Sequence, residues 1–318
     1  MTIFNKNNSV VAFLQHLRYW FAFNLERGYQ SYNKCVLCVS GPIGLYRLLA
    51  IEPILDEWKK QTFLNQECTY GDDRHLTNKI LEKGYQVVCN PYSTASTESP
   101  EAIYRFYKQQ TRWAKSSNRE VCWSIFYIHQ HSIFMTFDII YCFVYPFICL
   151  SIILSTLIKC AVESVTIYIV IILSIGLIKG IIATLITKNC EYLVYTLYSI
   201  VYLLLLIPAK LYALLTVTDI TWGTSSRKKI SFKLEFDFLF LLLWIILITG
   251  LFIRVIVIHL VMTQTYTMYN YILLVCIIII IMMFVCLFIY IHYYTSKKVS
   301  VISSIETSDR RFKNAHIA

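Results

Sequence analysis

Two adjacent carboxylates, Asp72 and Asp73, follow a glycine at a point where a new helix is expected to begin. A pair of this kind often only caps the helix and compensates its dipole, and the spacing alone favours that role. The alternative is a general base whose pKa is tuned by the neighbouring carboxylate. The pair is therefore the first candidate for proton-transfer chemistry in the chain.

A second candidate is the box Gln109-Gln110-Thr111-Arg112-Trp113, which lies on the next expected helix. Three further basic residues flank it: Lys108, Lys115 and Arg119. An Arg–Trp pair just ahead of a membrane usually anchors a helix at the interface, where basic residues bind lipid phosphates. In a catalytic site, Arg112 would bind a diphosphate through forked hydrogen bonds, and Trp113 would stack on a sugar or base. The residues alone leave these two interpretations even.

A third candidate is the segment from Trp222 to Lys229, which is small, flexible and basic and includes Thr224 and Arg227. By default such a segment is a cationic cytosolic loop. Its functional interpretation is a mobile flap that covers an anionic nucleotide. The residue types favour the plain loop unless another observation supports the flap.

The composition places these candidates in a membrane protein. Hydrophobic residues make up 57% of the chain and the mean hydropathy is +0.56, which is too apolar for a soluble domain of this size. Charged and apolar residues are mixed over 1–132, nearly all long apolar runs lie in 133–293, and 294–318 is polar. We therefore expect a soluble region, a membrane region and a cytosolic tail.

Charge and cysteine content exclude other classes of site. The net charge of +10 fits nucleic acid, a membrane surface or an anionic substrate, but cytosolic loops explain it in a membrane protein. No nucleic-acid partner is therefore expected. The 11 cysteines include one lone CxxC, Cys35 and Cys38, without the two further ligands that zinc needs. We expect reduced cysteines and no metal site built from them.

Four segments are expected to cross the membrane: 133–158, 165–187, 236–261 and 269–293. Each is long enough to span about 30 Å of hydrocarbon at about 1.5 Å per residue. The segment 193–215 is also apolar, but it contains Pro208 and Lys210, and a fifth crossing would move the basic tail outside. We therefore expect 193–215 to lie in the lipid bilayer at its cytosolic interface, and 219–235 to be cytosolic.

The soluble region alternates expected helices and strands, which is typical of an α/β sheet. Apolar spacing and breaker residues predict helices over 9–32, 45–60 and 73–83, and another that begins at Pro100. Apolar, β-branched runs predict strands at Cys35–Ser40 and Tyr85–Val88. The expected fold class is therefore a partial α/β domain followed by an α-helical, multi-pass membrane domain.

Taken together, the motifs resemble those of the hyaluronan synthases, which belong with chitin and cellulose synthases to the processive family 2 glycosyltransferases. The resemblance runs from about Val10 to about Lys229 and looks closer to animal-type hyaluronan synthases than to chitin synthases. Its landmarks, in chain order, are Leu17–Arg27, Ser40–Arg47, Gly71–Asn78, Gln109–Trp113, Leu206–Lys210 and Trp222–Arg227. The resemblance implies that residues 1–132 form the C-terminal part of a glycosyltransferase domain of the GT-A type.

The resemblance also implies roles for the first two motifs. Asp73 would be the general base that takes the proton from the acceptor hydroxyl, with Asp72 beside it. Gln109, Arg112 and Trp113 match the family's QxxRW box. In that box, Arg112 would hold the UDP pyrophosphate and Trp113 would line the acceptor end of the channel.

Two further stretches take on roles through the same resemblance. Trp222, Thr224 and Arg227 match a gating loop that closes over the bound UDP-sugar. The floor of the acceptor site would be shaped by a stretch that contains Ser40, Gly41 and Arg47. An inverting transfer needs a dry, closed site, and these two stretches would provide it.

The activity implied is the transfer of GlcNAc and GlcUA from UDP-GlcNAc and UDP-GlcUA to a growing polysaccharide, which is exported through the plasma membrane. The family uses Mg²⁺ or Mn²⁺ held by a DxD motif, and this chain contains no Asp-x-Asp. The family pattern also begins with two membrane helices and the first half of the transferase domain. We therefore expect the chain to be inactive alone, either as a fragment or because a second chain supplies that half.

Two alternatives stay open. A chitin synthase-like enzyme would use UDP-GlcNAc alone, and a pocket for the glucuronate carboxylate would distinguish the two enzymes. The other alternative is a non-catalytic membrane partner of a full-length synthase. The missing DxD motif favours that partner role, whereas Asp73 and the Arg112–Trp113 pair disfavour it.

Overall fold

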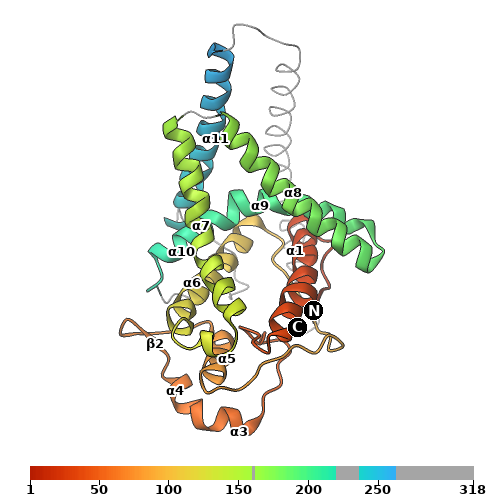
Figure 1. Cartoon of the computed structure of the whole chain (residues 1–318), viewed down its shortest axis with the longest axis vertical. Coiled ribbons are helices and arrows are strands. Elements are labelled where there is room, and N and C mark those ends of the chain that lie inside the picture. The colour runs from red at the N-terminus through yellow and green to blue at the C-terminus, as the bar shows by residue number, and fades with distance from the viewer. Residues whose placement is uncertain (160–161, 220–235, 263–318) are drawn as a thin grey trace, which may run out of the picture. The chain divides into compact units, whose positions relative to one another are not determined.

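The computed structural model describes residues 1–159, 162–219 and 236–262 (Figure 1). By its internal contacts the chain divides into two units, Met1–Val255 and Ile256–Ala318. Of the second unit, the structure describes only Ile256–Met262, which ends a helix.

The first long element is a nearly continuous helix, which confirms the prediction for 9–32. It consists of α1 (Val10–Phe21), the π-helix η1 (Ala22–Glu26) and α2 (Arg27–Tyr32). The Ser9 hydroxyl accepts a hydrogen bond from the backbone N–H of Ala12 at 3.1 Å. This bond satisfies one of the N–H groups that the first turn of a helix leaves open, so Ser9 defines the start.

The other helices predicted for the soluble region also form, although the one expected to begin at Pro100 begins at Ile103. The predicted 45–60 helix is divided by Pro53, which lacks a backbone N–H, into α3 (Leu48–Ile51), the 3-10 helix η2 (Glu52–Ile54) and α4 (Leu55–Lys59). The two motifs of the candidate site lie on α5 (Asp72–Glu82) and α6 (Ile103–Ser124). A short 3-10 helix, η3 (Ile128–Gln130), precedes the membrane region.

Little β-sheet accompanies these helices in the described part of the chain, which corrects the strand predictions. The pairs are β1 (Thr2–Ile3) with β4 (Ser96–Thr97), parallel, and β2 (Thr62–Phe63) with β3 (Gln66–Glu67), antiparallel. Of the strands predicted at Cys35–Ser40 and Tyr85–Val88, only a parallel bridge between Cys35 and Val87 is present. An independently stable sheet needs three or more strands, and these two runs have no further partner among the described residues. The first run is buried or half-buried, whereas in the second run only Val87 is buried, and the α/β sheet expected from them is reduced to one bridge.

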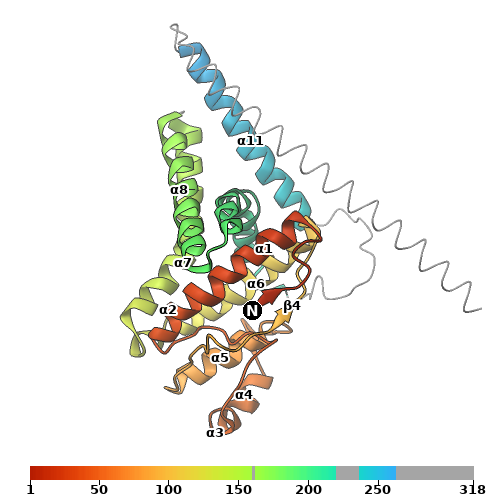
Figure 2. The ribbon, with the colours of Figure 1, turned by 90° about the vertical axis from the view of Figure 1, so that its right-hand side faces the viewer.

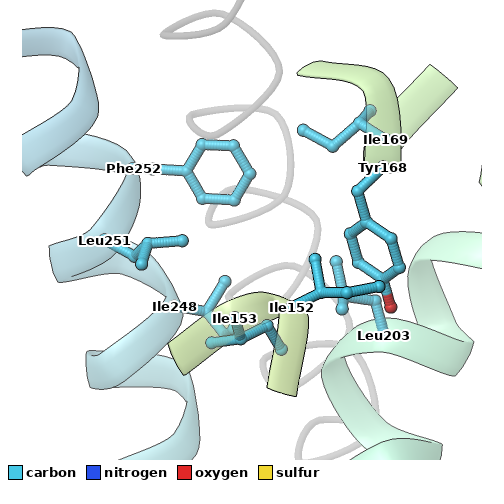
Figure 3. A pocket seen from close by; sticks show the side chains of 8 residues that line it. All are labelled: Ile152, Ile153, Tyr168, Ile169, Leu203, Ile248, Leu251 and Phe252. Atoms are coloured by element: carbon cyan, nitrogen blue, oxygen red, sulfur yellow. The ribbon is translucent and has the colours of Figure 1, made fainter. Parts of the chain in front are cut away.

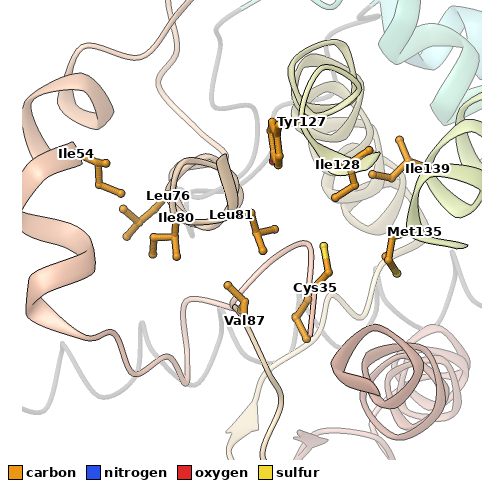
Figure 4. Close-up of a cluster of buried hydrophobic side chains, with 11 residues drawn as sticks. Cys35, Ile54, Leu76, Ile80, Leu81, Val87, Tyr127, Ile128, Met135 and Ile139 are labelled. Carbon is orange, nitrogen blue, oxygen red and sulfur yellow. The ribbon is translucent and has the colours of Figure 1, made fainter. Parts of the chain in front are cut away.

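Both runs contribute to the core of the soluble region (Figure 4). The cluster joins them to η2, to one face of α5, to η3 and to the start of α7 (Ile133–Lys159). Its members are Cys35, Val36, Ile54, Leu76, Ile80, Leu81, Val87, Tyr127, Ile128, Met135 and Ile139. Burial of each large apolar side chain contributes about 1.5–3 kcal/mol. The core therefore fixes α5 and continues from the soluble region into the first membrane-capable helix.

Four segments of the described chain are long and apolar enough to cross a membrane: Ile133–Ser155, Tyr168–Thr187, Cys190–Leu215 and Phe236–Arg254. The first, second and fourth lie in α7, α8 (Val162–Thr187) and α11 (Phe236–Met262). Helices therefore form where the spans 133–158, 165–187 and 236–261 are predicted, and they fit an α-helical membrane domain. The predicted span 269–293 lies outside the described residues.

The third segment, Cys190–Leu215, differs from the others, and we call it the crosswise stretch. It consists of η4 (Cys190–Leu197), α9 (Tyr198–Val201), the π-helix η5 (Tyr202–Leu206) and α10 (Ile207–Leu215). It extends sideways in Figure 1, across the direction of α7 and α11, and is seen nearly end-on in Figure 2. The Lys210 ammonium donates to the Tyr202 hydroxyl at 2.8 Å, so the lysine finds a partner inside the protein. Its location at the bilayer interface stays a prediction.

Two glycines set how closely α8 packs against the crosswise stretch. A Cβ on Gly176 would lie 2.3 Å from Ser199 Oγ, and one on Gly180 would lie 2.8 Å from the Tyr192 carbonyl oxygen. Small residues four positions apart let the backbones of membrane helices approach each other closely. This contact fixes α8 to η4 and α9.

An apolar pocket lies among α7, α8, the crosswise stretch and α11 (Figure 3). It is lined by Ile152, Ile153, Tyr168, Ile169, Leu203, Ile248, Leu251 and Phe252. Seven of these side chains are hydrocarbon only, and the Tyr168 hydroxyl is the single polar side-chain group in the lining. The candidate site must therefore be sought at α5 and α6.

Candidate active site

The carboxylate pair opens α5, as predicted. Gly71 precedes it with a φ of +87°, a conformation that glycine adopts without strain. Asp73 Oδ1 accepts the backbone N–H of Arg74 at 2.8 Å, and both carboxylates lie at the positive end of the helix dipole. Asp73 is half-buried, whereas Asp72 is exposed. Gly71 is the N-cap residue and no side chain caps the helix, so the pair acts here through the dipole and the Arg74 contact, and Asp72 is open to solvent.

Helix α6 crosses the start of α5 at Gly71. A Cβ at this position would lie 2.0 Å from Ser116 Oγ and 2.7 Å from Ser116 Cβ. Any larger side chain would displace one helix from the other. The glycine thus serves the turn before α5 and the close approach of α6 together.

Arg112 is the residue of the QxxRW box that faces the carboxylate pair. Burial lowers the pKa of its guanidinium, while the charges of Tyr70, Asp73 and Asp72 raise it by a smaller amount. Arginine remains charged in proteins, so a half-buried cation lies close to two carboxylates. The structure therefore brings together the base candidate and the phosphate-binding candidate.

The segment that begins at Cys38 lies against the first turn of α5. The Cys38 thiol donates to Asp73 Oδ2 at 3.7 Å. The Val39 N–H bonds to Thr77 Oγ1 at 2.9 Å, and the Thr77 hydroxyl donates to the Asp73 carbonyl oxygen at 2.7 Å. Burial raises the pKa of the Cys38 thiol, which keeps it a neutral donor beside the carboxylate.

The predicted floor of the acceptor site is only partly joined to this group. Ser40 Oγ accepts a hydrogen bond from Arg27 Nη2 at 3.4 Å, which holds it near α2. Gly41 and Arg47 are exposed, and none of the described interactions connects them to Asp73. The structure therefore places Cys38 and Val39 at the pair and leaves Gly41 and Arg47 open to solvent, while Tyr46 between them packs against the core.

Two further residues of the box, Gln109 and Trp113, are four positions apart and therefore lie on the same side of α6. The Trp113 side chain is 39% exposed, and its ring centroid lies 6.5 Å from that of Tyr19 on α1. Gln109 Oε1 is buried and has no hydrogen-bond partner among the described atoms. The gating-loop candidates Trp222, Thr224 and Arg227 lie outside the described residues.

Asp219, the first residue of the predicted gating loop 219–235, is held against the same helix. Lys115 donates to Asp219 Oδ2 at 2.8 Å, and the Tyr70 hydroxyl donates to the Asp219 carbonyl oxygen at 2.8 Å. Arg119 Nη2 in turn donates to the Tyr70 carbonyl oxygen at 3.1 Å. Sequence reasoning noted Lys115 and Arg119 only as basic neighbours of the box. It missed Asp219, because no local pattern marks a partner separated by 104 residues.

The family resemblance implies a divalent metal, which would need several oxygen ligands at this site. The described residues contain no group of three or more His, Cys, Asp or Glu side chains that could hold an ion. Asp72 and Asp73 could supply carboxylate oxygens, but Mg²⁺ and similar cations also need other ligands in near-octahedral geometry. The described residues therefore do not fit the metal by themselves.

No family model matches the chain. Hyaluronan synthase 3 of Xenopus laevis and hyaluronan synthase 2 of Homo sapiens are each 37% identical to it over 228 residues, which are 72% of this chain and 41% of theirs. Hyaluronan synthase 1 of Xenopus laevis is 39% identical over 228 residues, which are 72% of this chain and 39% of its own. Over these 228 residues the chain is homologous to the hyaluronan synthases.

This homology confirms the resemblance drawn from the motifs and makes this chain a glycosyltransferase homologue, and its four membrane-capable helices fit a membrane protein. The chain spans about two fifths of the length of these hyaluronan synthases. The residue roles are not part of this identification and stay predictions. Of the predicted site residues, the structure brings together Asp72, Asp73 and Arg112, with Trp113 beside Arg112 on the same helix.

Proposed function

We propose that the chain supplies acceptor activation and diphosphate binding to a hyaluronan synthase-type transferase. Such an enzyme builds a polysaccharide from UDP-GlcNAc and UDP-GlcUA and exports it through the membrane. The observation that supports this proposal most directly is the contact of α5 with α6, which sets Arg112 close to Asp72 and Asp73. The relatives are hyaluronan synthases, which supports hyaluronan as the product.

In this proposal Asp73 is the general base. Its carboxylate takes the proton of the acceptor hydroxyl while that oxygen attacks the anomeric carbon of the donor sugar. The bond from that carbon to UDP breaks in the same step, and the electron pair leaves with the diphosphate. Asp72, exposed beside the base, would accept a hydrogen bond from the acceptor sugar and orient it.

Arg112 would hold the diphosphate. The forked guanidinium matches two phosphate oxygens, and its partial burial strengthens the attraction by excluding water. The negative charge that develops on the leaving UDP is thereby stabilised in the transition state. Because the described residues do not fit the family's Mg²⁺ or Mn²⁺, this scheme contains no step through a metal.

The other predicted residues complete the proposal. The half-exposed Trp113 and the neighbouring Tyr19 ring would line the acceptor channel, where an aromatic face can stack on a sugar. Gln109 would offer its buried side-chain oxygen to the same region. Trp222, Thr224 and Arg227 are proposed to close over the donor, and Ser40, Gly41 and Arg47 to border the acceptor.

We place this site on the cytosolic side of the plasma membrane. The basic soluble region, the basic segment 219–235 and the basic tail 294–318 would all be cytosolic. The crosswise stretch would lie at the interface, since its direction differs from that of α7 and α11 (Figures 1 and 2). The polymer would then leave the site directly towards the bilayer.

A chimera tests the proposed function. Residues 10–229 of this chain replace the matching part of Xenopus laevis hyaluronan synthase 1, and membranes that carry the chimera receive both UDP-sugars. The expected result is a polymer that hyaluronidase digests. Asp73→Asn and Arg112→Ala should each lower its formation by about 100-fold or more. Asp56→Asn, at an exposed carboxylate on α4, is the matched control and should leave the rate unchanged.

The same assay separates the alternatives. A chitinase-sensitive polymer made from UDP-GlcNAc alone would assign a chitin synthase-like activity instead. A folded chimera that makes no polymer would refute the enzymatic proposal and favour a non-catalytic partner. The chain expressed without the remainder of a synthase is expected to be inactive, so sugar incorporation by that preparation would overturn the need for a second contributor.

A further inference from the structure

A buried carboxylate ties α6 to α5 behind the proposed active site. Glu120 is 5% exposed and lies about two turns beyond Arg112 on α6. Its Oε1 accepts from the Gln61 amide at 3.2 Å and from His75 Nδ1 at 2.9 Å, and its Oε2 accepts from Asn78 Nδ2 at 2.8 Å. Because a carboxylate only accepts, each partner is a donor, including the Nδ1–H of His75. Two of the three donors belong to α5.

The contact continues along the same side of α6. Ser116 fills the space beside Gly71, and Arg119 Nη2 donates to the Tyr70 carbonyl oxygen at 3.1 Å. Arg112, one turn before Ser116, faces the carboxylate pair. These positions recur at helical spacing, so one stripe of α6 holds α5 together with the turn that leads into it.

A buried carboxylate is a costly way to join two helices. It must be removed from water, and the cost is offset only when its oxygens are fully hydrogen-bonded. Apolar side chains join helices without that cost, but apolar attraction has no direction. Hydrogen bonds from three donors fix an angle and a rotation as well as a distance. The Glu120 contact therefore indicates that the orientation of α5 relative to α6 matters.

We infer that Glu120 is a positioning residue for the proposed sugar transfer. By holding His75 and Asn78 it fixes the first two turns of α5, so that Asp73 meets both the acceptor hydroxyl and the diphosphate held by Arg112. Glu120 acts through α5, and its described contacts are with α5 and with Gln61, which follows α4. This inference rests on the proposed function, in which a misplacement of about 1 Å costs on the order of 100-fold in rate.

The hydrogen bonds of Glu120 allow a test in which the negative charge moves from residue 120 to residue 78 while both side chains keep their size. In Glu120→Gln, the new amide NH₂ would oppose the NH₂ of Asn78, and one hydrogen bond would be lost. Adding Asn78→Asp restores it, because the new carboxylate accepts from that amide. The same carboxylate still accepts the Tyr127 hydroxyl, which donates to Asn78 Oδ1 at 2.8 Å. Glu52→Gln, at an exposed carboxylate on η2, is the matched control.

All variants are made in the chimera, and both sugar transfer and hydrogen exchange of the α5 amides are measured. Glu120→Gln should lower kcat by roughly 10- to 100-fold with KM for the UDP-sugars nearly unchanged, since binding through Arg112 persists. The double variant should return kcat to within about threefold of the parent. The α5 amides should lose protection in the single variant and regain it in the double variant.

Several results would overturn the inference. One is a kcat of Glu120→Gln equal to that of Glu52→Gln, and another is a double variant no faster than the single one. If Glu120→Gln does not accumulate in membranes, the double variant decides: a folded, slow double variant refutes positioning and a fast one supports it. If the parent chimera makes no polymer, the proposed function fails, and hydrogen exchange shows separately whether Glu120 holds α5.

Discussion

Replacement of Gly71 by alanine should loosen the start of α5, and the structure separates two contributions to the effect. The φ of +87° costs an L-amino acid about 1 kcal/mol. The added methyl group would lie 2.0 Å from Ser116 Oγ. Overpacking of this kind costs about 1–3 kcal/mol. The sum of about 2–4 kcal/mol corresponds to a loss of roughly 30- to 900-fold in protection of the α5 amides against hydrogen exchange.

Mass spectrometry of the peptides that cover Asp72–Glu82 measures this protection in detergent-solubilised protein. Adding Ser116→Gly to Gly71→Ala removes the collision but not the backbone strain, so all but about 1 kcal/mol should be recovered. Gly28→Ala is the matched control, since a Cβ on Gly28 meets nothing within 4 Å. Exchange in Gly71→Ala equal to that control, or a double variant no better than the single, would refute this account of the α5–α6 contact.

Three further predictions follow from other contacts. Gly176→Leu should separate α8 from the crosswise stretch and lower the melting temperature by several degrees, which thermal unfolding in detergent would detect. A double-mutant cycle of Lys115→Met and Asp219→Asn should give a coupling of about 0.5–3 kcal/mol in the free energy of unfolding, and no coupling would contradict the ion pair. Glu26 forms an ion pair with Arg18 at 2.8 Å. Burial raises the pKa of the Glu26 carboxyl, but Arg18 and other nearby cations lower it by more, so the pKa lies below its usual 4.5. The ion pair should therefore stabilise the protein above about pH 4.5 and lose that effect as the pH falls through the lowered pKa, so Glu26→Gln should lose less stability than the parent in an acid titration.

The helices of the soluble region could be predicted because their signals are local. Ser9 caps α1, Gly71 precedes α5, and the apolar spacing over 9–32 persists through the π-helix in its middle. The strands could not be predicted in the same way. An apolar, β-branched run indicates burial, but a strand also needs a neighbour, and Cys35 pairs only with Val87 among the described residues.

The candidate site was predictable as separate motifs and not as an assembly. Asp72, Asp73 and Arg112 each have a local signature, whereas their proximity depends on the contact of Gly71 with Ser116, which no local pattern reveals. Hydrogen bonds between residues far apart in the chain are even harder to predict from the local sequence.

Other contacts differ in how well the sequence predicts them. Glu120 and Asp219 are unremarkable acidic residues until the fold brings donors to them. The pair Gly176 and Gly180, by contrast, is readable from the sequence, since small residues four apart in an apolar segment predict a close helix crossing.

The crosswise stretch has a mechanical consequence. Tyr107 on α6 packs against Ala209 of α10, and Arg112 follows it by five residues, or about 7.5 Å along the helix. A bilayer whose thickness tilts or lifts α10 would therefore also shift the middle of α6, where Arg112 lies. Under the proposed function, the rate of sugar transfer would then depend on the thickness of the membrane around the protein.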